Sequence, residues 1–226
     1  MKDQPEMTDR SKHNTANLRF LMPVWIALIL SVIVAVWEGW WPLAAMSTLT
    51  LILSLAPNLL ASRYDIALPK AFVVSMVVFI VASLIMGEVF DVYYRIWWWD
   101  LALHGLSAIA LGMIGFLFIY MLFHGDNFAA PAGAIAFLAF TFALSIGALW
   151  EIFEYTMDVV FGTNMQKSAN DTMIDLIFDA IGAIVGALAG YAYLKGRRKG
   201  LLSRLLNDFV TLNRHLYKKT RRLDRD

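Results

Sequence analysis

Acidic residues and one histidine recur at helical spacing in the last three hydrophobic stretches of this chain. They are Asp100 and His104 in the first stretch, Glu151, Glu154 and Asp158 in the second, and Asp171, Asp175 and Asp179 in the third. Intervals of three or four residues place each set along one face of its own helix. An ionisable side chain inside a membrane span costs about 2.5–3.5 kcal/mol on insertion scales, so such residues usually mark a function. The spacing therefore predicts one polar site shared by three neighbouring helices.

Carboxylate oxygens together with an imidazole nitrogen are ligands for divalent cations such as Mg²⁺, Mn²⁺, Ca²⁺, Fe²⁺ and Zn²⁺. Clustered carboxylates repel one another unless protons or a bound cation neutralise them. Arg95 and Lys167 are too few to balance this cluster. We therefore expect a divalent metal cation as cofactor, with the candidate ligands Asp100, His104, Glu151, Glu154, Asp171, Asp175 and Asp179. Asp158 is expected to lie at the wet rim of the site and to matter less.

Two other interpretations of the acids stay open, namely protonatable groups coupled to transport and structural polar contacts. The spacing is not that of a diiron bundle, which uses Glu-x-x-His pairs. No glycine-rich phosphate loop and no serine in a nucleophile elbow is found in the sequence. Three functions are therefore compatible with the chain: a metal-dependent enzyme acting on a lipid-type substrate, a cation- or proton-coupled transporter, and an accessory subunit that binds a partner protein.

The composition indicates which elements must position these side chains. Of the 226 residues, 59% are hydrophobic and only 16% are charged, whereas soluble domains carry roughly 25% charged residues. A span needs about 20 mostly apolar residues, and six segments qualify: 20–37, 42–61, 69–90, 100–123, 131–158 and 171–194. The fold class predicted is an all-α polytopic membrane bundle of six transmembrane helices, over residues 20–195, after a polar tail at 1–19. The chain has no cysteine, so neither a disulfide nor a thiolate metal site is expected.

The distribution of basic residues predicts the orientation. Seventeen of the 19 lysines and arginines fall in the N-terminal tail, the second loop and the C-terminal tail. Such residues mark the cytoplasmic side, so both termini are expected in the cytoplasm. The acids then lie on the outer side, and at 1.5 Å rise per residue Asp179 lies about 12 Å deeper than Asp171.

A basic amphipathic segment is predicted at the end of the chain, over residues 200–226. Its apolar stripe contains Leu205, Phe209, Leu212 and Leu216, which suits a helix lying on an anionic membrane surface. Membrane lipids are therefore the expected partners, and no nucleic acid is expected. A homo-oligomer or a membrane-protein partner stays open. Glycines at 182, 186 and 190 form a ridge of small residues, which we expect to pack helices within the bundle.

Three motifs in order give the chain a resemblance to a known family. They are Asp100-Leu-Ala-Leu-His104-Gly105, Ala148-Leu-Trp-Glu151-Ile-Phe-Glu154-Tyr155, and Asn170-Asp171-Thr-Met-Ile-Asp175-Leu-Ile-Phe-Asp179. Across residues 95–190 the sequence resembles the YjdF-like family of bacterial inner-membrane proteins, which is functionally uncharacterised. The resemblance implies a location in a bacterial inner membrane and makes these same acids a family signature, but it implies no substrate.

Overall fold

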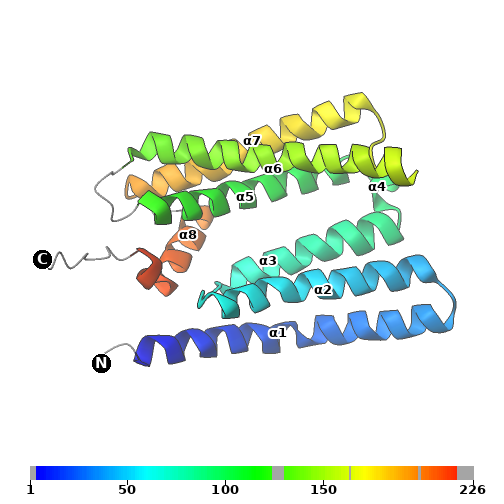
Figure 1. Ribbon diagram of the computed structural model, residues 1–226, viewed down its shortest axis with the longest axis horizontal. Coiled ribbons are helices and arrows are strands. Elements are labelled where there is room, and N and C mark those ends of the chain that lie inside the picture. Colours follow the sequence, from blue (N-terminus) through cyan, green and yellow to red (C-terminus); the bar gives the residue numbers. More distant parts are fainter. Residues whose placement is uncertain (1–3, 124–129, 163, 198–199, 218–226) are drawn as a thin grey trace, which may run out of the picture. The chain divides into compact units, whose positions relative to one another are not determined.

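The protein is built from helices in the computed structural model, which describes residues 4–123, 130–162, 164–197 and 200–217 (Figure 1). Six of these helices are long and apolar enough to cross a membrane: Arg19–Trp37, Trp41–Arg63, Lys70–Val89, Trp99–Phe123, Ala132–Phe161 and Ala169–Leu194. Every end lies within three residues of the predicted one. The predicted all-α fold with six spanning helices is therefore confirmed. The helices fall into two compact units, Met1–Trp99 and Asp100–Asp226.

Unit 1 contains the first three spans. Helix α1 (Gln4–Trp37) packs against α2 (Trp41–Arg63), and α3 (Lys70–Ile80) continues as the π-helix η1 (Val81–Val89) before the short α4 (Val92–Arg95). Most of the stretch predicted as a polar tail thus extends the first helix. Polar contacts join α1 to α2, because Trp25 Nε1 donates to Ser54 Oγ at 3.1 Å.

Unit 2 contains the polar cluster. It is formed by α5 (Trp99–Phe123), α6 (Ala132–Phe161), α7 (Ala169–Leu194), α8 (Leu201–Leu212) and the 3-10 turn η2 (Arg214–Tyr217). Helix α6 ends at Gly162, whose φ of 67° is a conformation that glycine adopts without strain. Ser168 then caps α7 by accepting from Asp171 N at 3.1 Å. This short connection turns the chain back, so that α7 packs along α6.

The apolar core of unit 2 lies at the end away from the polar cluster. Phe116 and Tyr193 pack edge to face there with ring centroids 6.0 Å apart, and Phe116 is completely buried. Helix α8 covers this core, because Leu206 is fully buried in it and Tyr217 donates a hydrogen bond to the Leu117 carbonyl at 3.2 Å. Much of the stripe predicted to face lipid thus packs on protein; residues 218–226 of the predicted segment lie outside the described residues.

Glycines allow α7 to approach α5 closely between the core and the polar cluster. A Cβ added at Gly182 would overlap the backbone oxygen of Gly105, and one at Gly186 would lie 2.5 Å from the Ile109 oxygen. At Gly190 a Cβ would overlap the Phe116 ring. These contacts place the predicted glycine ridge inside unit 2, where it sets the distance between two helices that carry site residues.

Candidate metal centre

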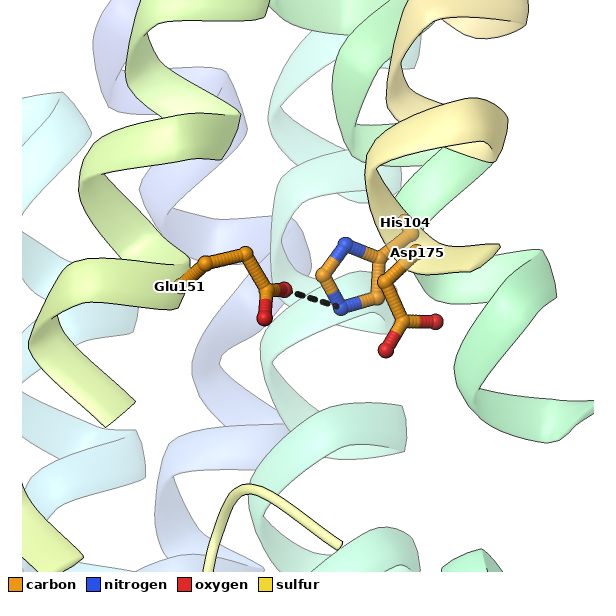
Figure 2. A group of neighbouring side chains, drawn as sticks. All are labelled: His104, Glu151 and Asp175. Carbon is orange, nitrogen blue, oxygen red and sulfur yellow. Dashed lines mark ion pairs between the residues drawn. The ribbon is translucent and has the colours of Figure 1, made fainter. Parts of the chain in front are cut away.

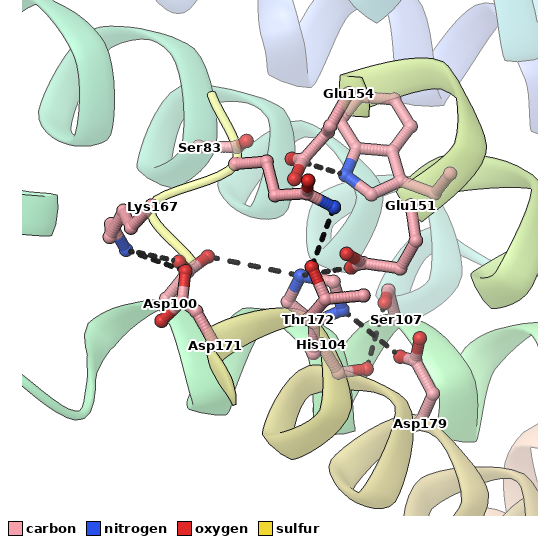
Figure 3. A network of polar contacts seen from close by, with 12 residues as sticks. Ser83, Asp100, His104, Ser107, Glu151, Glu154, Lys167, Asp171, Thr172 and Asp179 are labelled. Carbon is pink, nitrogen blue, oxygen red and sulfur yellow. Dashed lines mark hydrogen bonds and ion pairs between the residues drawn. The ribbon is translucent and has the colours of Figure 1, made fainter. Parts of the chain in front are cut away.

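The polar residues of three helices meet at one end of unit 2 (Figure 3). Helices α5 and α7 begin at this end, and α6 ends there. Asp100 and His104 therefore come from the first turns of α5, Glu151 from about two thirds of the way along α6, and Asp175 from the second turn of α7. The spacing predicted that the polar residues of these helices converge. They meet because of the order of the helices and because a short connection joins α6 to α7.

The inner group consists of His104, Glu151 and Asp175, whose side chains point toward one another from three helices (Figure 2). One ligand atom from each lies within 4.8 Å of the others, and the residues are only 9%, 5% and 3% exposed. His104 Nε2 lies 3.8 Å from Glu151 Oε1, which is too long for a hydrogen bond. Two ligands of one cation at about 2.0–2.2 Å each lie about 3–4 Å apart, so this separation suits a shared cation.

Asp179 fixes the orientation of the histidine ring. His104 Nδ1 lies 3.3 Å from Asp179 Oδ1, and Asp179 is 2% exposed. A carboxylate accepts hydrogen bonds, so Nδ1 carries the proton and Nε2 faces Glu151 and Asp100, at 3.8 and 3.9 Å. Metal-binding histidines commonly donate a hydrogen bond from the N–H of their second ring nitrogen to a carboxylate in this way. Asp179, predicted as a ligand, thus lies behind the candidate ligand His104 and orients its ring.

Several buried carboxylate oxygens of the cluster have no hydrogen-bond partner among the described residues. They are both oxygens of Glu151, Oδ1 of Asp175 and Oδ2 of Asp179. The Thr172 side chain lies near Glu151, but without the geometry of a hydrogen bond. Buried polar groups are nearly always paired, and an unpaired buried charge is costly. The arrangement therefore calls for protons or a cation among these oxygens.

The outer group consists of Asp100, Asp171 and Asp175, and one ligand atom from each lies within 4.8 Å of the others. Lys167 contacts this group, with Nζ 2.6 Å from Asp100 Oδ2 and 3.8 Å from Asp171 Oδ2. Partial burial acts to lower the pKa of Lys167, but the hydrogen bond to Asp100 and the nearby negative charges outweigh it and raise the pKa above its ordinary value. The outer group thus holds a positively charged ammonium.

Asp158 supports the connection between α6 and α7. Its two oxygens accept the backbone N–H groups of Met165 and Gln166 at 2.8 and 2.9 Å. Gln166 Nε2 in turn donates to Thr172 Oγ1 at 2.7 Å. Asp158 therefore lies outside both groups and holds the segment that carries Lys167, a structural role that its position at the end of a span did not indicate.

Glu154 lies apart from the inner and outer groups. Its Oε1 accepts a hydrogen bond from Trp150 Nε1 at 2.8 Å, one helical turn earlier. Trp150 and Phe153 are exposed and pack together with ring centroids 5.3 Å apart. Glu154 thus contacts an exposed apolar surface of α6, although we predicted it as a ligand beside the others.

Gly147 is a site residue that the sequence reasoning missed. A Cβ at this position would overlap the Asp179 carboxylate, so only glycine leaves room for Asp179 beside α6. Its position one turn before Glu151 on the same face was the available signal.

Comparisons with known proteins agree with this description. The family described as "Predicted membrane protein (DUF2238)" matches residues 19–196, a range that includes all six spans and the polar cluster. A relative from Thermotoga maritima named "Uncharacterized protein" is 33% identical over 114 residues, which cover 50% of this chain and 58% of the relative. The chain thus spans little more than half of that relative's length. No solved structure matches this chain. The expectation of an uncharacterised membrane-protein family is confirmed, and the chain belongs to the DUF2238 family of predicted membrane proteins.

Proposed function

We propose that unit 2 binds a divalent cation in the inner group and uses it as a metal-dependent enzyme on a lipid-type substrate. The observation that carries the proposal is the buried set of His104, Glu151 and Asp175, held at cation-bridging distances with unpaired oxygens. The imidazole favours Mn²⁺, Fe²⁺ or Zn²⁺ over Ca²⁺. Three protein ligands leave coordination positions open, as catalytic metal sites do.

The apolar core of unit 2, at the end away from the polar cluster, favours a site open to one side of the membrane rather than a transport pathway. The interior there is filled by apolar side chains such as Met113, Phe116 and Ile135, and α8 covers them. An ion crossing along this unit would have to displace that packed core, in which none of the described buried side chains carries a charge that could replace its hydration shell. The cluster is therefore better suited to chemistry at one face of the membrane than to conduction through it.

The surroundings of Glu154 support the substrate class. This carboxylate follows the buried Glu151 by three residues on α6 and accepts a hydrogen bond from Trp150, which forms an exposed apolar surface with Phe153. An amphipathic molecule could place its polar group at the cluster and its chain along this apolar surface. A bound divalent cation would supply an activated water as nucleophile. We assign Glu154 as the candidate proton acceptor, because it lies one helical turn from Glu151 without belonging to either ligand group.

Metal analysis of the purified protein tests the cation site. We expect wild type dialysed against Mn²⁺ or Zn²⁺ to retain about one ion per chain, and Glu151→Gln to lose it, because the amide keeps the shape of the side chain but not its charge. The matched control is Glu38→Gln, which makes the same change at an exposed position of unit 1. A wild-type protein that retains no metal, or a Glu151→Gln variant that retains as much as wild type, contradicts the proposal.

We also propose that the cluster faces the outer side of a bacterial cytoplasmic membrane, with both termini in the cytoplasm. Seventeen of the 19 basic residues lie in the tails and the second loop, and such residues mark the cytoplasmic side.

The chain has no native cysteine, so single cysteines report this orientation cleanly. Asn164→Cys, at an exposed position of the connection between α6 and α7, should react with an impermeant maleimide in intact cells. Arg204→Cys, exposed on α8, should react only after the membrane is opened. The reverse pattern would overturn the orientation.

A further inference from the structure

We infer that the outer group is a second cation position, and that the Lys167 ammonium serves as its resident cation in the wild-type protein. The inference rests on the proposed cation site, because Asp175 belongs to both the inner and the outer group. It assigns the polar cluster two adjacent positive charges, one from a bound divalent cation and one from a lysine of the chain itself.

The contacts of Lys167 show that a cation fits in the outer group. The ammonium lies 2.6 Å from Asp100 and 3.8 Å from Asp171, and an ammonium is a compact point charge much like a small ion. Lys167 lies on the connection between α6 and α7, outside both helices. Its side chain can therefore be withdrawn or replaced without changing a span.

A buried, unpaired oxygen of Asp175, a member of this group, is a second sign of a ligand beside these carboxylates. Asp175 is 3% exposed, and its Oδ1 has no hydrogen-bond partner among the described residues. Asp100 likewise reaches both groups, with Oδ2 on Lys167 and Oδ1 3.9 Å from His104 Nε2. Asp175 thus connects the two cation positions, as a bridging carboxylate does in a two-metal site, and Asp100 lies beside His104 at the edge of the inner group.

The two groups differ in chemistry and exposure. The outer group offers only carboxylate oxygens, which suit Mg²⁺, Ca²⁺ and Mn²⁺, whereas the inner group adds an imidazole that suits borderline metals. The side chains of Asp100 and Asp171 are 23% and 30% exposed, whereas that of Glu151 is 5% exposed. The outer group therefore lies on the solvent side of the inner one, where a hydrated ion can reach it once the ammonium is gone.

Removal of the lysine charge tests the inference on full-length protein in detergent. With Mn²⁺ as probe, Lys167→Met should raise binding from about one to about two ions per chain, because three carboxylates are then left without their cation. Lys167→Arg keeps a positive charge and should stay at about one. Lys195→Met removes the same charge beyond the last turn of α7 and should also leave the count at about one.

Three further experiments support this test. Lys167→Gln keeps a polar side chain and should give the same count of about two ions if Lys167→Met folds poorly. Two Mn²⁺ ions that share Asp175 should couple magnetically and broaden the electron paramagnetic resonance spectrum, which wild type should not show. Adding Asp171→Asn to Lys167→Met should remove the second ion and leave the first.

The outcomes separate this inference from the proposed function. Equal Mn²⁺ binding by wild type, Lys167→Met and Lys167→Gln, at one ion per chain, would overturn the second position and leave the inner site standing. No ion in wild type but one in Lys167→Met would overturn the inner site and support the outer one. No ion in any of these proteins would overturn both.

Discussion

Replacing Asp175 by Asn should abolish stabilisation by divalent cations and, at the same time, make the cation-free protein more stable. Asp175 belongs to both groups and lies almost fully buried among Glu151, Asp100 and Asp171. Without a divalent cation its charge adds to those of Glu151, Asp100 and Asp171, which the single Lys167 ammonium offsets only in part, and burying like charges is unfavourable. The amide keeps the shape of the side chain and removes one of these charges.

The expected thermal shifts follow from mass action. A ligand at 100 times its Kd stabilises the folded state by about 2.7 kcal/mol, which corresponds to roughly 5–11 °C in Tm for a chain of this size. Residues that hydrogen-bond to metal ligands contribute up to about 100-fold to metal affinity. Loss of a direct ligand should therefore weaken cation binding by at least about that factor. At the same cation concentration the variant should then gain only about 0.4 kcal/mol, or roughly 1 °C.

Melting curves with and without Mn²⁺ should therefore cross over: the variant melts above wild type in chelator and below it in excess Mn²⁺. The control is Asp208→Asn, which removes one carboxylate from the exposed side of α8 and should leave the cation-dependent shift unchanged. If Asp175→Asn melts below wild type in chelator yet keeps the full cation shift, Asp175 is a structural residue and the cation binds elsewhere.

The sequence was sufficient to predict which helices carry the site and that they converge. Each span is a long apolar run between polar segments, so its ends could be placed within three residues. The intervals from Asp100 to His104 and from Asp171 to Asp175 put those residues on single helix faces. The short connection at 162–168 left α6 and α7 no arrangement other than antiparallel neighbours, with their acids at the same end.

The partners of individual acids could not be predicted, because they depend on rotations that helical spacing leaves free. Asp158 and Glu154 lie one turn apart, yet Asp158 accepts backbone N–H groups of the connection and Glu154 accepts from Trp150. Asp179 looks like a third ligand on α7 in the sequence, but Gly147 opens a space that brings it against His104 Nδ1. The Asp179 contact therefore also depends on helix-to-helix distance, which a small residue on the facing helix controls.

The helix-to-helix distance itself should be tested at Gly182. We expect Gly182→Leu to disrupt unit 2 and Gly182→Ala to destabilise it by about 1–3 kcal/mol, the usual cost of overpacking. A Cβ there would overlap the Gly105 oxygen and lie 2.8 Å from the Ala108 Cβ. Gly133→Ala is the matched control, because nothing lies within 4 Å of its added Cβ, and helix propensity alone should make it neutral or stabilising by up to about 1 kcal/mol.

The group that an added Cβ would overlap, side chain or backbone, predicts whether a second substitution can restore the stability of each glycine variant. At Gly190 the obstacle is the Phe116 side chain, so Phe116→Leu should recover part of the stability that Gly190→Ala loses. At Gly182 the main obstacle is backbone, so Ala108→Gly should recover little. Since Gly182 lies one turn beyond Asp179, separation of α7 from α5 should also pull Asp179 away from His104 and reduce the cation-dependent Tm shift. Rescue of Gly182→Ala by Ala108→Gly, with the cation shift intact, would show that the helix-to-helix distance does not hold the site together.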